Sequence, residues 1–325
     1  MKLLVTGGAG FIGSNFVRYW LKHHGDDHIV ILDALTYAGD KANLKGVDAS
    51  RVAFVRGDIT NRGAVEYAMA EADVVVHFAA ETHVDRSIKD SQIFLKTNII
   101  GTHVLLEEAR RRDGQIMRFH HVSTDEVFGA LEISESRKFN ENTPYAPRSP
   151  YAASKAASDH LVRAYFSTYG VPTTITNCSN NYGPYQHPEK FIPTAIAAAL
   201  AGNAIPVYGD GLYVRDWLHV EDHCRGIEAA ILHGRPGETY CLGGDAERTN
   251  LEICRLVLGT LGKPPSFIKH VADRLGHDRR YAIDSSKAKR ELGWTPRWKF
   301  EDGLRETVGW YRVNQALWMP RLKQR

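Results

Sequence analysis

The sequence has no apolar stretch long enough to cross a bilayer. The apolar residues after Met1 and Lys2 are interrupted by glycines from Gly7 onward, which argues against a secretory signal peptide. Cysteine is scarce, and its spacing matches neither a C-x-x-C pair nor a disulfide framework. The pattern predicts reduced, mostly buried thiols in a cytoplasmic protein. The four cysteines are Cys178, Cys224, Cys241 and Cys254.

An excess of charge of one sign is also missing. The chain has 41 Lys and Arg against 38 Asp and Glu, for a formal net charge of +3. Because the basic residues are scattered along the chain, we expect neither a nucleic acid nor a membrane as a partner.

Clustered metal ligands are lacking as well. His219 and His223 lie four residues apart and would share a helix face, which suggests a metal site. Zinc sites usually need at least three protein ligands, and no third ligand stands at a suitable spacing. We therefore expect no bound metal.

Short runs of Val, Ile and Leu alternate with helical stretches in the first half of the chain. This rhythm is typical of a parallel sheet with crossover helices, and runs without polar alternation fit strands buried on both faces. The fold class is therefore α/β, with a Rossmann-type doubly wound parallel sheet. The expected strands are Lys2 to Thr6, Ile29 to Asp33, Val52 to Arg56, Val74 to Phe78, Phe119 to Ser123 and Thr173 to Asn177.

The composition changes after about residue 180, where loops rich in Pro, Gly and Asn join short helices such as 191–201 and 251–261. We expect residues 1–180 to form a nucleotide-binding domain. Residues 181–325 would mainly form a smaller mixed α/β substrate domain. The segment 204–242 is expected to return to the first domain, so a single clean boundary is not expected.

A glycine-rich turn, Gly7-Gly8-Ala9-Gly10-Phe11-Ile12-Gly13, follows the first strand and precedes an amphipathic helix. Glycines let the backbone turn tightly and approach a pyrophosphate, and the helix N-terminus attracts the anion. Asp33 ends the second strand twenty residues after Gly13, where a carboxylate can hold a ribose diol. No arginine adjoins Asp33 to accept a 2′-phosphate, so the pattern favours NAD over NADP.

Asp58 and Ile59 follow the third strand and offer a polar and an apolar contact for adenine. The competing interpretation of Asp58 is a helix N-cap.

Tyr151 and Lys155 lie one helical turn apart, so the ammonium can favour the ionised phenol and make it a base. A Tyr-Lys pair on a solvated helix is the alternative. Thr124-Asp125-Glu126 precedes this pair. A simple dehydrogenase needs no such carboxyls, so they indicate that carbon–hydrogen and carbon–oxygen bonds are also handled, as in an internal redox dehydration.

Asp125 and Glu126 could not both reach one sugar from a regular strand, because strand residues alternate between faces. We therefore expect the strand to end near Ser123 or Thr124. The alternatives are a helix N-cap for Thr124 or Asp125 and a surface position for Glu126.

Together these motifs resemble the extended short-chain dehydrogenase/reductase family and, within it, the dTDP-glucose 4,6-dehydratases. The resemblance covers nearly the whole chain. Related UDP-galactose 4-epimerases lack the Asp-Glu pair, and UDP-glucuronate decarboxylases and GDP-mannose 4,6-dehydratases typically have Ser in place of Asp125. The similar segments are the glycine turn, Asp33 to Gly39, Ala79 to Ser87, Ser123 to Gly129, Tyr151 to Lys155, Asn180 to Pro193 and Tyr213 to His223.

The resemblance implies a role for each residue in converting dTDP-glucose to its 4-keto-6-deoxy product and water. Tyr151 would take the proton of the 4-hydroxyl while NAD accepts hydride from carbon 4 and later returns it to carbon 6. Glu126 would remove the carbon 5 proton, and protonated Asp125 would donate to the leaving 6-hydroxyl. Thr124 would orient the 4-hydroxyl, and Lys155 would also hold the nicotinamide ribose.

The resemblance also implies which residues line the binding pockets. For NAD these are Gly7, Gly10, Phe11, Ile12, Gly13, Asp33, Thr36, Asp58, Ile59, Phe78, Ala79, Thr97, Tyr151, Lys155 and Asn181. For the substrate they are Thr82, Thr124, Asn180, Glu189, Lys190, Pro206, Tyr208, Arg215, Asn250, Arg274 and His277. Exposed loop positions are the alternative for each substrate contact.

Three positions depart from the family pattern. Leu275 replaces a proline in the substrate loop, which removes a fixed φ angle there. Phe128 replaces the usual tyrosine, and Ser91 replaces a common proline. These departures concern pocket detail and leave the catalytic triplet unchanged.

Two other functions stay open: a UDP-sugar 4-epimerase or decarboxylase of the same family, and a non-catalytic NAD sensor. The resemblance further implies a homodimer, for which the helices over 103–112 and 152–166 are suitable.

Overall fold

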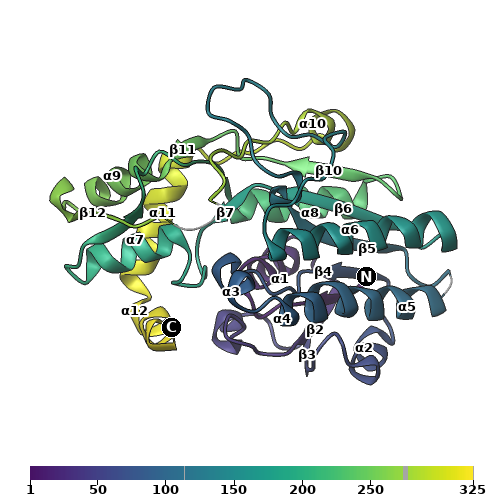
Figure 1. The fold of residues 1–325 in the computed structure, drawn as a ribbon. Helices are drawn as coiled ribbons and strands as arrows, with labels where there is room; N and C mark the ends of the chain where they lie inside the picture. The colour runs from purple at the N-terminus through teal and green to yellow at the C-terminus, as the bar shows by residue number, and fades with distance from the viewer. Residues whose placement is uncertain (113, 274–276, 325) are drawn as a thin grey trace.

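Each of the six apolar runs forms a strand whose ends lie within one residue of those expected. The computed structural model describes residues 1–112, 114–273 and 277–324. Its largest sheet has seven described strands, all paired in parallel (Figure 1). In spatial order they are β10 (Thr239–Leu242), β6 (Thr173–Cys178), β5 (Arg118–Thr124), β4 (Val74–His77), β1 (Lys2–Thr6), β2 (His28–Asp33) and β3 (Val52–Arg56).

Helices cover both faces of this sheet because its strands are apolar on both sides. Leu3 and Val5 pack with α1 (Phe11–His23) and α8 (Val220–Leu232), whereas Leu4 packs toward the opposite face. That opposite face is covered by α2 (Arg62–Met69), α5 (Thr102–Arg111) and α6 (Pro150–Tyr169). The prediction of a doubly wound α/β fold is confirmed.

The strand order reverses between β1 and β4. From β1 the chain proceeds outward through β2 and β3, then returns to β4 and continues outward through β5 and β6. In open parallel sheets of this kind, ligands bind outside the carboxyl ends of the strands at the reversal. The glycine turn follows β1 at that place.

Short helices fill the connections around this edge. They are η1 (Lys41–Leu44), α3 (Val84–Lys89), α4 (Gln92–Phe94), the π-helix η2 (Leu95–Gly101) and the 3-10 helix η3 (Asp125–Phe128).

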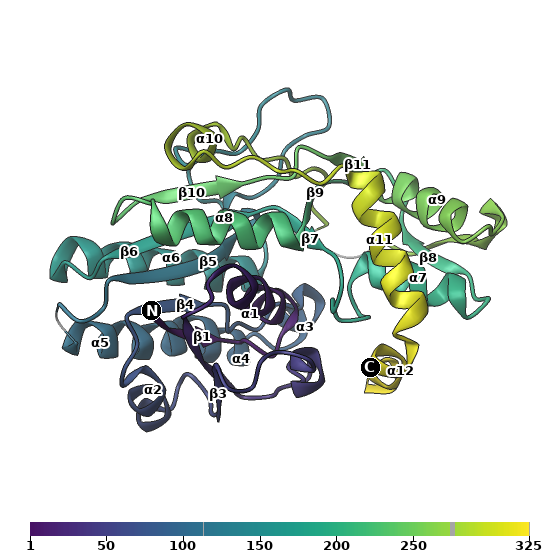
Figure 2. The ribbon, with the colours of Figure 1, turned by 180° about the vertical axis from the view of Figure 1, so that it is seen from behind.

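The smaller part of the molecule has its own apolar core, in which Ile196, Trp217 and Leu304 are buried. It lies beyond the carboxyl edge of the large sheet (Figure 2). Its strands are β7 (Asn180–Tyr182), β9 (Val214–His219) and β11 (Glu247–Thr249) in one sheet, and β8 (Ile205–Tyr208) and β12 (Ile268–Val271) in another. Its helices are α7 (Phe191–Leu200), α9 (Asn250–Thr260), η4 (Pro265–Phe267), α11 (Phe300–Val313), α12 (Gln315–Trp318) and η5 (Met319–Gln324).

The segment 204–242 is divided between the two parts. β8 and β9 belong to the small sheets, whereas α8 packs on the large sheet and β10 extends it beside β6. After β12 the chain crosses back once more and forms α10 (Ser286–Leu292), which packs near β10. The boundary at residue 180 stays a prediction, because strand pairing alone does not define a domain.

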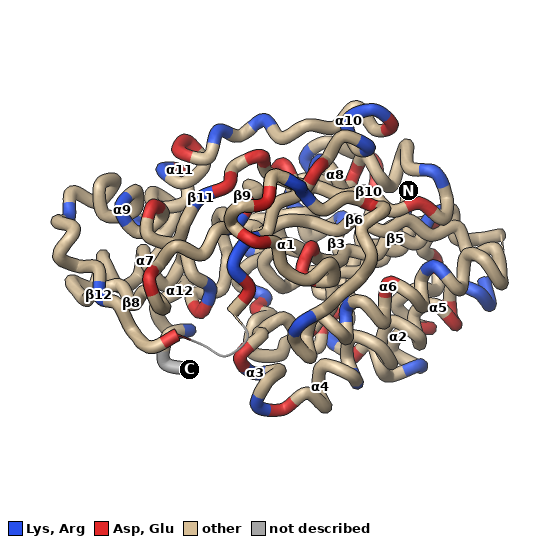
Figure 3. Tube along the Cα trace, turned by 45° about the horizontal axis from the view of Figure 1, so that its top comes forward, with Lys and Arg blue, Asp and Glu red and all other residues tan. Residues whose placement is uncertain are grey.

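Acidic and basic residues are interspersed over both parts of the molecule (Figure 3). None of the helices within the described ranges is long and apolar enough to span a membrane.

Candidate active site

The sharp turn between β1 and α1 forms one wall of a cavity. Gly7 has a φ of +70°, and a Cβ there would lie 2.7 Å from the backbone nitrogen of Ala79. A Cβ at Gly13 would lie 2.3 Å from the carbonyl oxygen of Gly7. Gly10 caps α1 without a side-chain hydrogen bond, and the first turn holds no acidic residue. The N–H groups of that turn are therefore suited to an anion such as a pyrophosphate.

Asp33 lines the same cavity at the end of β2. Its carboxylate accepts hydrogen bonds from the backbone N–H groups of Ala9 (2.9 Å) and Leu35 (2.8 Å), which fix its orientation. Burial raises the pKa of Asp33. The carboxylate lies where a ribose diol was expected to bind.

Asp58 also lines this cavity, and it does not cap a helix. Its Oδ1 accepts hydrogen bonds from the backbone and hydroxyl of Thr60, while the N-cap of α2 is Asn61. The alternative of an N-cap for Asp58 is therefore wrong.

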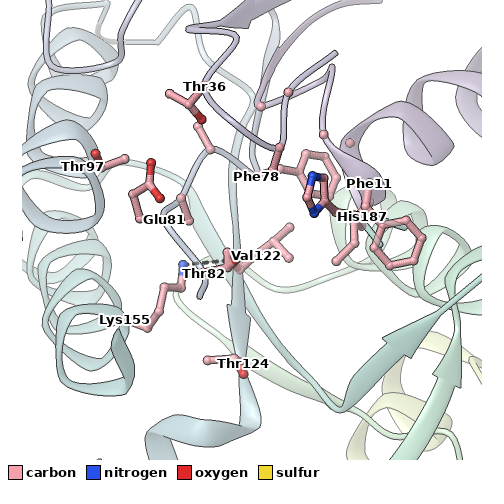
Figure 4. Close-up of a pocket in the computed structure, with 18 of the residues that line it drawn as sticks. Phe11, Thr36, Phe78, Glu81, Thr82, Thr97, Val122, Thr124, Lys155 and His187 are labelled. Carbon is pink, nitrogen blue, oxygen red and sulfur yellow. Dashed lines mark hydrogen bonds between the residues drawn. The ribbon is translucent and has the colours of Figure 1, made fainter. Parts of the chain in front are cut away.

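The Thr124-Asp125-Glu126 triplet lies where β5 ends and η3 begins, as expected from the alternation of strand side chains. Thr124 caps η3, because its Oγ1 accepts the N–H of Glu126 at 3.3 Å. This bears out the N-cap alternative for Thr124 without removing it from the site. All three residues line the cavity, and Figure 4 shows Thr124 at the end of its strand.

Asp125 is almost completely buried, at 1% exposure. Its Oδ1 contacts the Thr124 hydroxyl, and its Oδ2 has no hydrogen-bond partner among the described residues. Burial, followed by the charges of Glu126 and Asp216, raises the pKa of Asp125 well above its ordinary value. The group is therefore held as a neutral acid, which a proton donor requires.

Tyr151 and Lys155 lie on α6 and both line the cavity, so the solvated-helix alternative is wrong. Lys155 Nζ donates to the carbonyl oxygen of Val122 at 2.9 Å, shown as a dashed line in Figure 4. The expected lowering of the phenol pKa is not found. Burial and then the charge of Glu126 raise the pKa of Tyr151 well above its ordinary value. A positive charge beside the phenol is needed to offset these effects.

A second cavity adjoins the first and extends between the two parts of the molecule. Arg215 lies here, 6% exposed, with its guanidinium 4.3 Å from the ring centroid of Tyr281. Lys190 Nζ donates to the carbonyl oxygen of Thr82, which ties the small part to the loop after β4. The two cavities form one cleft, since both are lined by Thr82, Glu126, Asn180, Asn181, Gln186, Glu189 and Lys190.

The cleft brings together every predicted site residue within the described ranges; their roles stay predictions. The first cavity is lined by Gly7, Gly10, Phe11, Ile12, Gly13, Asp33, Thr36, Asp58, Ile59, Phe78, Ala79, Thr97, Thr124, Asp125, Glu126, Tyr151, Lys155 and Asn181. The second is lined by Thr82, Asn180, Glu189, Lys190, Pro206, Tyr208, Arg215, Asn250 and His277. Arg274 and Leu275 lie outside the described residues.

Several cleft residues were missed from the sequence. Arg86 reaches the second cavity from α3, and its guanidinium lies 3.6 Å from the buried carboxylate of Glu189 and 3.9 Å from the ring centroid of Tyr37. Glu81 lines the first cavity, where burial raises its pKa. Both follow β4, whose carboxyl end opens on the same edge as the glycine turn, and that position was the available signal.

His219 and His223 do not share a helix face, so that expectation is wrong. His219 ends β9 and caps α8, while His223 Nδ1 lies 2.8 Å from Asn181 Oδ1 inside the helix packing. The two imidazoles serve as a cap and as support for a cleft residue.

Two departures from the family pattern are placed away from the triplet's side chains. Phe128 is buried and stacks on Phe139 with ring centroids 5.3 Å apart. Ser91 precedes α4, where its carbonyl oxygen accepts the N–H groups of Phe94 and Leu95.

A reversed parallel sheet with a glycine turn, opposite a buried Tyr-x-x-x-Lys pair, defines an enzyme of the extended short-chain dehydrogenase/reductase class. Comparison with known proteins agrees. Residues 4–307 match the family model described as GDP-mannose 4,6 dehydratase. A dTDP-glucose 4,6-dehydratase of Mycolicibacterium smegmatis is 52% identical over 98% of this chain and 96% of its own length.

Two crystal structures are also similar. DesIV, a dTDP-glucose 4,6-dehydratase of Streptomyces venezuelae with NAD and dTDP bound, has a TM-score of 0.95 at 51% identity, covering 99% of this chain and 100% of DesIV. The dTDP-glucose 4,6-dehydratase of Bacillus anthracis with NAD has a TM-score of 0.92 at 48% identity, covering 99% of both chains. The chain belongs to the dTDP-glucose 4,6-dehydratases of the extended short-chain dehydrogenase/reductase family.

Proposed function

We propose that the protein converts dTDP-glucose to dTDP-4-keto-6-deoxyglucose and water, with NAD as a cofactor that stays bound. The carrying observation is the pair Asp125 and Glu126 at the end of β5, in one cleft with Tyr151 and with the nucleotide-binding turn. The similar enzymes of known structure support the choice of substrate and cofactor.

The residues of the first cavity fit NAD. The turn admits only glycine at positions 7 and 13, so its backbone can approach a pyrophosphate, and Asp33 is oriented for a ribose diol. Among its described lining residues this cavity has no arginine to accept a 2′-phosphate, which favours NAD over NADP. When bound, NAD supplies a hydride acceptor for carbon 4 and returns the hydride to carbon 6, and its nicotinamide ring is cationic until reduced.

Tyr151 accepts the proton of the 4-hydroxyl, and the Thr124 hydroxyl orients that group. Lys155 holds the nicotinamide ribose, and its ammonium supplies positive charge near the phenol. Because burial raises the pKa of Tyr151, such charge is needed before the phenol can act as a base.

Glu126 removes the proton from carbon 5, which the 4-ketone has acidified. Asp125 donates its proton to the leaving 6-hydroxyl, so that the carbon–oxygen bond breaks and water departs. Two adjacent carboxyls can serve as base and acid only if their protonation differs, and the burial of Asp125 provides the neutral partner.

The second cavity supplies the nucleotide end of the substrate site. Arg215 offers a fork of donors to the diphosphate, assisted by Asn180, and Asn181 faces the nicotinamide. The residues assigned to thymine are Glu189, Lys190, Pro206 and Tyr208, with Thr82, Asn250 and His277 completing the described pocket.

The alternatives are weaker. A UDP-sugar 4-epimerase or decarboxylase does not need Asp125, and a non-catalytic NAD sensor does not need Tyr151, Lys155, Asp125 and Glu126 in one cleft.

The purified protein, incubated with dTDP-glucose in deuterated water and followed by NMR, tests this proposal. We expect the 4-keto-6-deoxy sugar with deuterium at carbon 5, because the proton held by a carboxylate exchanges with solvent. Unchanged sugar, or the 4-epimer, would rule out the dehydratase.

Asp125→Asn tests the acid assignment. The amide cannot donate a proton in the same way, so we expect kcat to fall by about 100-fold or more, with reduced cofactor or a 4-keto-glucose intermediate accumulating. Tyr151→Phe is the matched variant, because it should block the oxidation and leave the cofactor oxidised. Absorbance at the reduced-nicotinamide band separates the two. Normal elimination by Asp125→Asn would contradict the assignment.

We also propose a cytoplasmic homodimer, with a cofactor domain over 1–180 and a substrate domain over 181–325. All four cysteines are buried and unpaired, as expected in a reducing compartment. The dimer would form through α5 and α6, and sedimentation analysis of the purified protein tests this.

A further inference from the structure

Helix α6 carries a buried carboxylate that the proposed mechanism does not use. Asp159 lies one turn after Lys155 and is 0% exposed. Its Oδ2 accepts hydrogen bonds from Ser123 Oγ (2.9 Å), Tyr145 OH (2.8 Å) and Asn177 Nδ2 (3.3 Å). Three neutral donors around one oxygen indicate that the carboxylate is kept ionised in the core, where an unpaired charge is costly.

His121 lies between this carboxylate and Lys155. Its Nε2 is 3.2 Å from Asp159 Oδ1 and 3.3 Å from Lys155 Nζ. Burial, then the charge of Lys155, lowers the pKa of His121 to about 4. The ring is therefore neutral near pH 7, and it separates two ions without carrying a charge of its own.

The two ions support each other's charge. Burial lowers the pKa of Lys155, and the first effect opposing it is the negative charge of Asp159. Burial would raise the pKa of Asp159, but His121, Lys155 and the Tyr145 hydroxyl outweigh it, so that this pKa is lowered. Lys155 has only a backbone carbonyl and the neutral His121 as printed close contacts, so Asp159 is its nearest identified balancing anion on the core side.

The other ionisable groups facing this pair differ in charge. Burial lowers the pKa of His77 on β4 well below its usual range and raises that of Cys178 on β6, so both are neutral. The remaining groups are Tyr151 and Arg163 on α6, Asp125 and Glu126 on η3, and Tyr145 on the loop before α6. Arg163 acts through Tyr145, to whose hydroxyl its guanidinium donates at 2.7 Å.

We propose that Asp159 is a positioning residue for the dehydratase reaction: acting across His121, its buried carboxylate holds Lys155 as an ammonium ion beside Tyr151. This role rests on the proposed function. Asp159 touches neither the cleft nor the reacting atoms, since it is absent from the residues that line both cavities.

Asp159→Asn removes the charge and keeps the shape, so its kinetic test is the pH profile. Without the anion the pKa of Lys155 falls further, and the ammonium is lost at lower pH. We expect the alkaline limb of kcat/KM for dTDP-glucose to move down by about one pH unit or more. A merely structural role would lower activity at every pH and leave the limb in place.

Two controls separate charge from packing. Glu108→Gln neutralises another buried carboxylate, which pairs with Arg112 on α5, and should not move the limb. Tyr145→Phe removes one donor to Asp159 but leaves its charge, and should also leave the limb in place. A limb that is unchanged in Asp159→Asn, or that moves equally in Glu108→Gln, would overturn the proposal.

Unfolding of the protein without substrate tests the charge pair independently of the reaction. In a cycle of Asp159→Asn, Lys155→Met and the double variant, the loss of thermal midpoint in the double variant should be smaller than the sum of the two single losses. Additive losses would overturn the proposal, whereas failure to dehydrate dTDP-glucose would leave this result standing.

Lys155→Met also covers the case in which Asp159→Asn does not fold. The lowered pKa of Asp159 contributes stability above its unfolded-state pKa, and this is lost as the pH falls through the folded-state pKa. Removing the lysine raises that folded-state pKa. We therefore expect acid unfolding to begin at a higher pH in Lys155→Met than in the wild type, and an unchanged onset would contradict the pairing.

Discussion

The two sides of the cleft place their side chains in different ways. On the large-sheet side, Gly7, Phe78 and Thr124 stand at the ends of adjacent strands, so sheet pairing alone brings them together. On the small-sheet side, Arg215 and Asn250 come from β9 and the start of α9, with His277 in a loop between α9 and α10. The chemical groups thus stand on the side fixed by regular backbone geometry, and nucleotide recognition on the side assembled from distant segments.

The difference extends to what each side tolerates. At the glycine turn the nearest obstacles to a new side chain are backbone atoms, which cannot move without shifting β1 or β4. In the second cavity the lining consists of long side chains that can adjust. We therefore expect substitutions on the large-sheet side to act in an all-or-none way, and those on the small-sheet side to be graded.

Gly13→Ala should have the largest effect. Its Cβ would lie 2.3 Å from the carbonyl oxygen of Gly7, so the turn must open and displace the backbone that faces the pyrophosphate. We expect NAD affinity to fall by about 100-fold or more, measured by calorimetry on cofactor-stripped protein. Gly25→Ala is the control, since nothing lies within 4 Å of the added Cβ. Near-normal affinity in Gly13→Ala would show that the turn is adaptable and would remove the contrast.

Arg215→Met should have a graded effect. Its guanidinium donates to the carbonyl oxygen of Asp278 at 2.8 Å and lines the second cavity, where a diphosphate would take charge-assisted hydrogen bonds. Losing them should raise KM for dTDP-glucose by about 10- to 100-fold, with a smaller change in kcat.

Arg279→Met is the matched control for Arg215→Met. Arg279 also stacks on a tyrosine, Tyr213, but pairs with Asp210 at the surface and does not line the cavity. Steady-state kinetics should leave its KM unchanged. A fall in kcat of Arg215→Met with constant KM would instead place Arg215 among the groups that act on the reacting sugar.

The large-sheet side could be predicted from the sequence because its signals are local. Apolar runs fix the strands, and the alternation of side chains required the strand before Asp125 to end at Thr124, as it does. The glycine pattern likewise reports a turn whose crowding is set by its own neighbours.

Features that depend on tertiary packing were harder to predict. The raised pKa of Tyr151 comes from burial and from Glu126, which the Tyr-Lys spacing does not reveal. Arg86 and Glu81 could be located only once β4 was placed beside β1. His219 and His223 misled because their spacing suggests one helix, whereas β9 ends between them.

The C-terminal segment connects the two sides, and its removal should have the smallest effect. Arg321 in η5 is 6% exposed, and its NH2 donates to Asp40 Oδ2 (2.8 Å) and Asn43 Oδ1 (2.9 Å). Asn43 in turn donates to the carbonyl oxygen of Ala9 in the glycine turn at 2.9 Å. The small part thereby holds the loop that borders the proposed ribose site.

Arg321→Gln should lower the thermal midpoint by about 2–4 °C, because one partly exposed ion pair and a hydrogen bond contribute little to a chain of this size. It should also speed NAD dissociation, since the loop after Asp33 is held less firmly. Arg312→Gln, at an exposed position on α11, is the control and should change neither quantity. If Arg321→Gln lowered the midpoint but left NAD dissociation unchanged, the two sides would be joined without being coupled, and cofactor retention would be set by the large-sheet side alone.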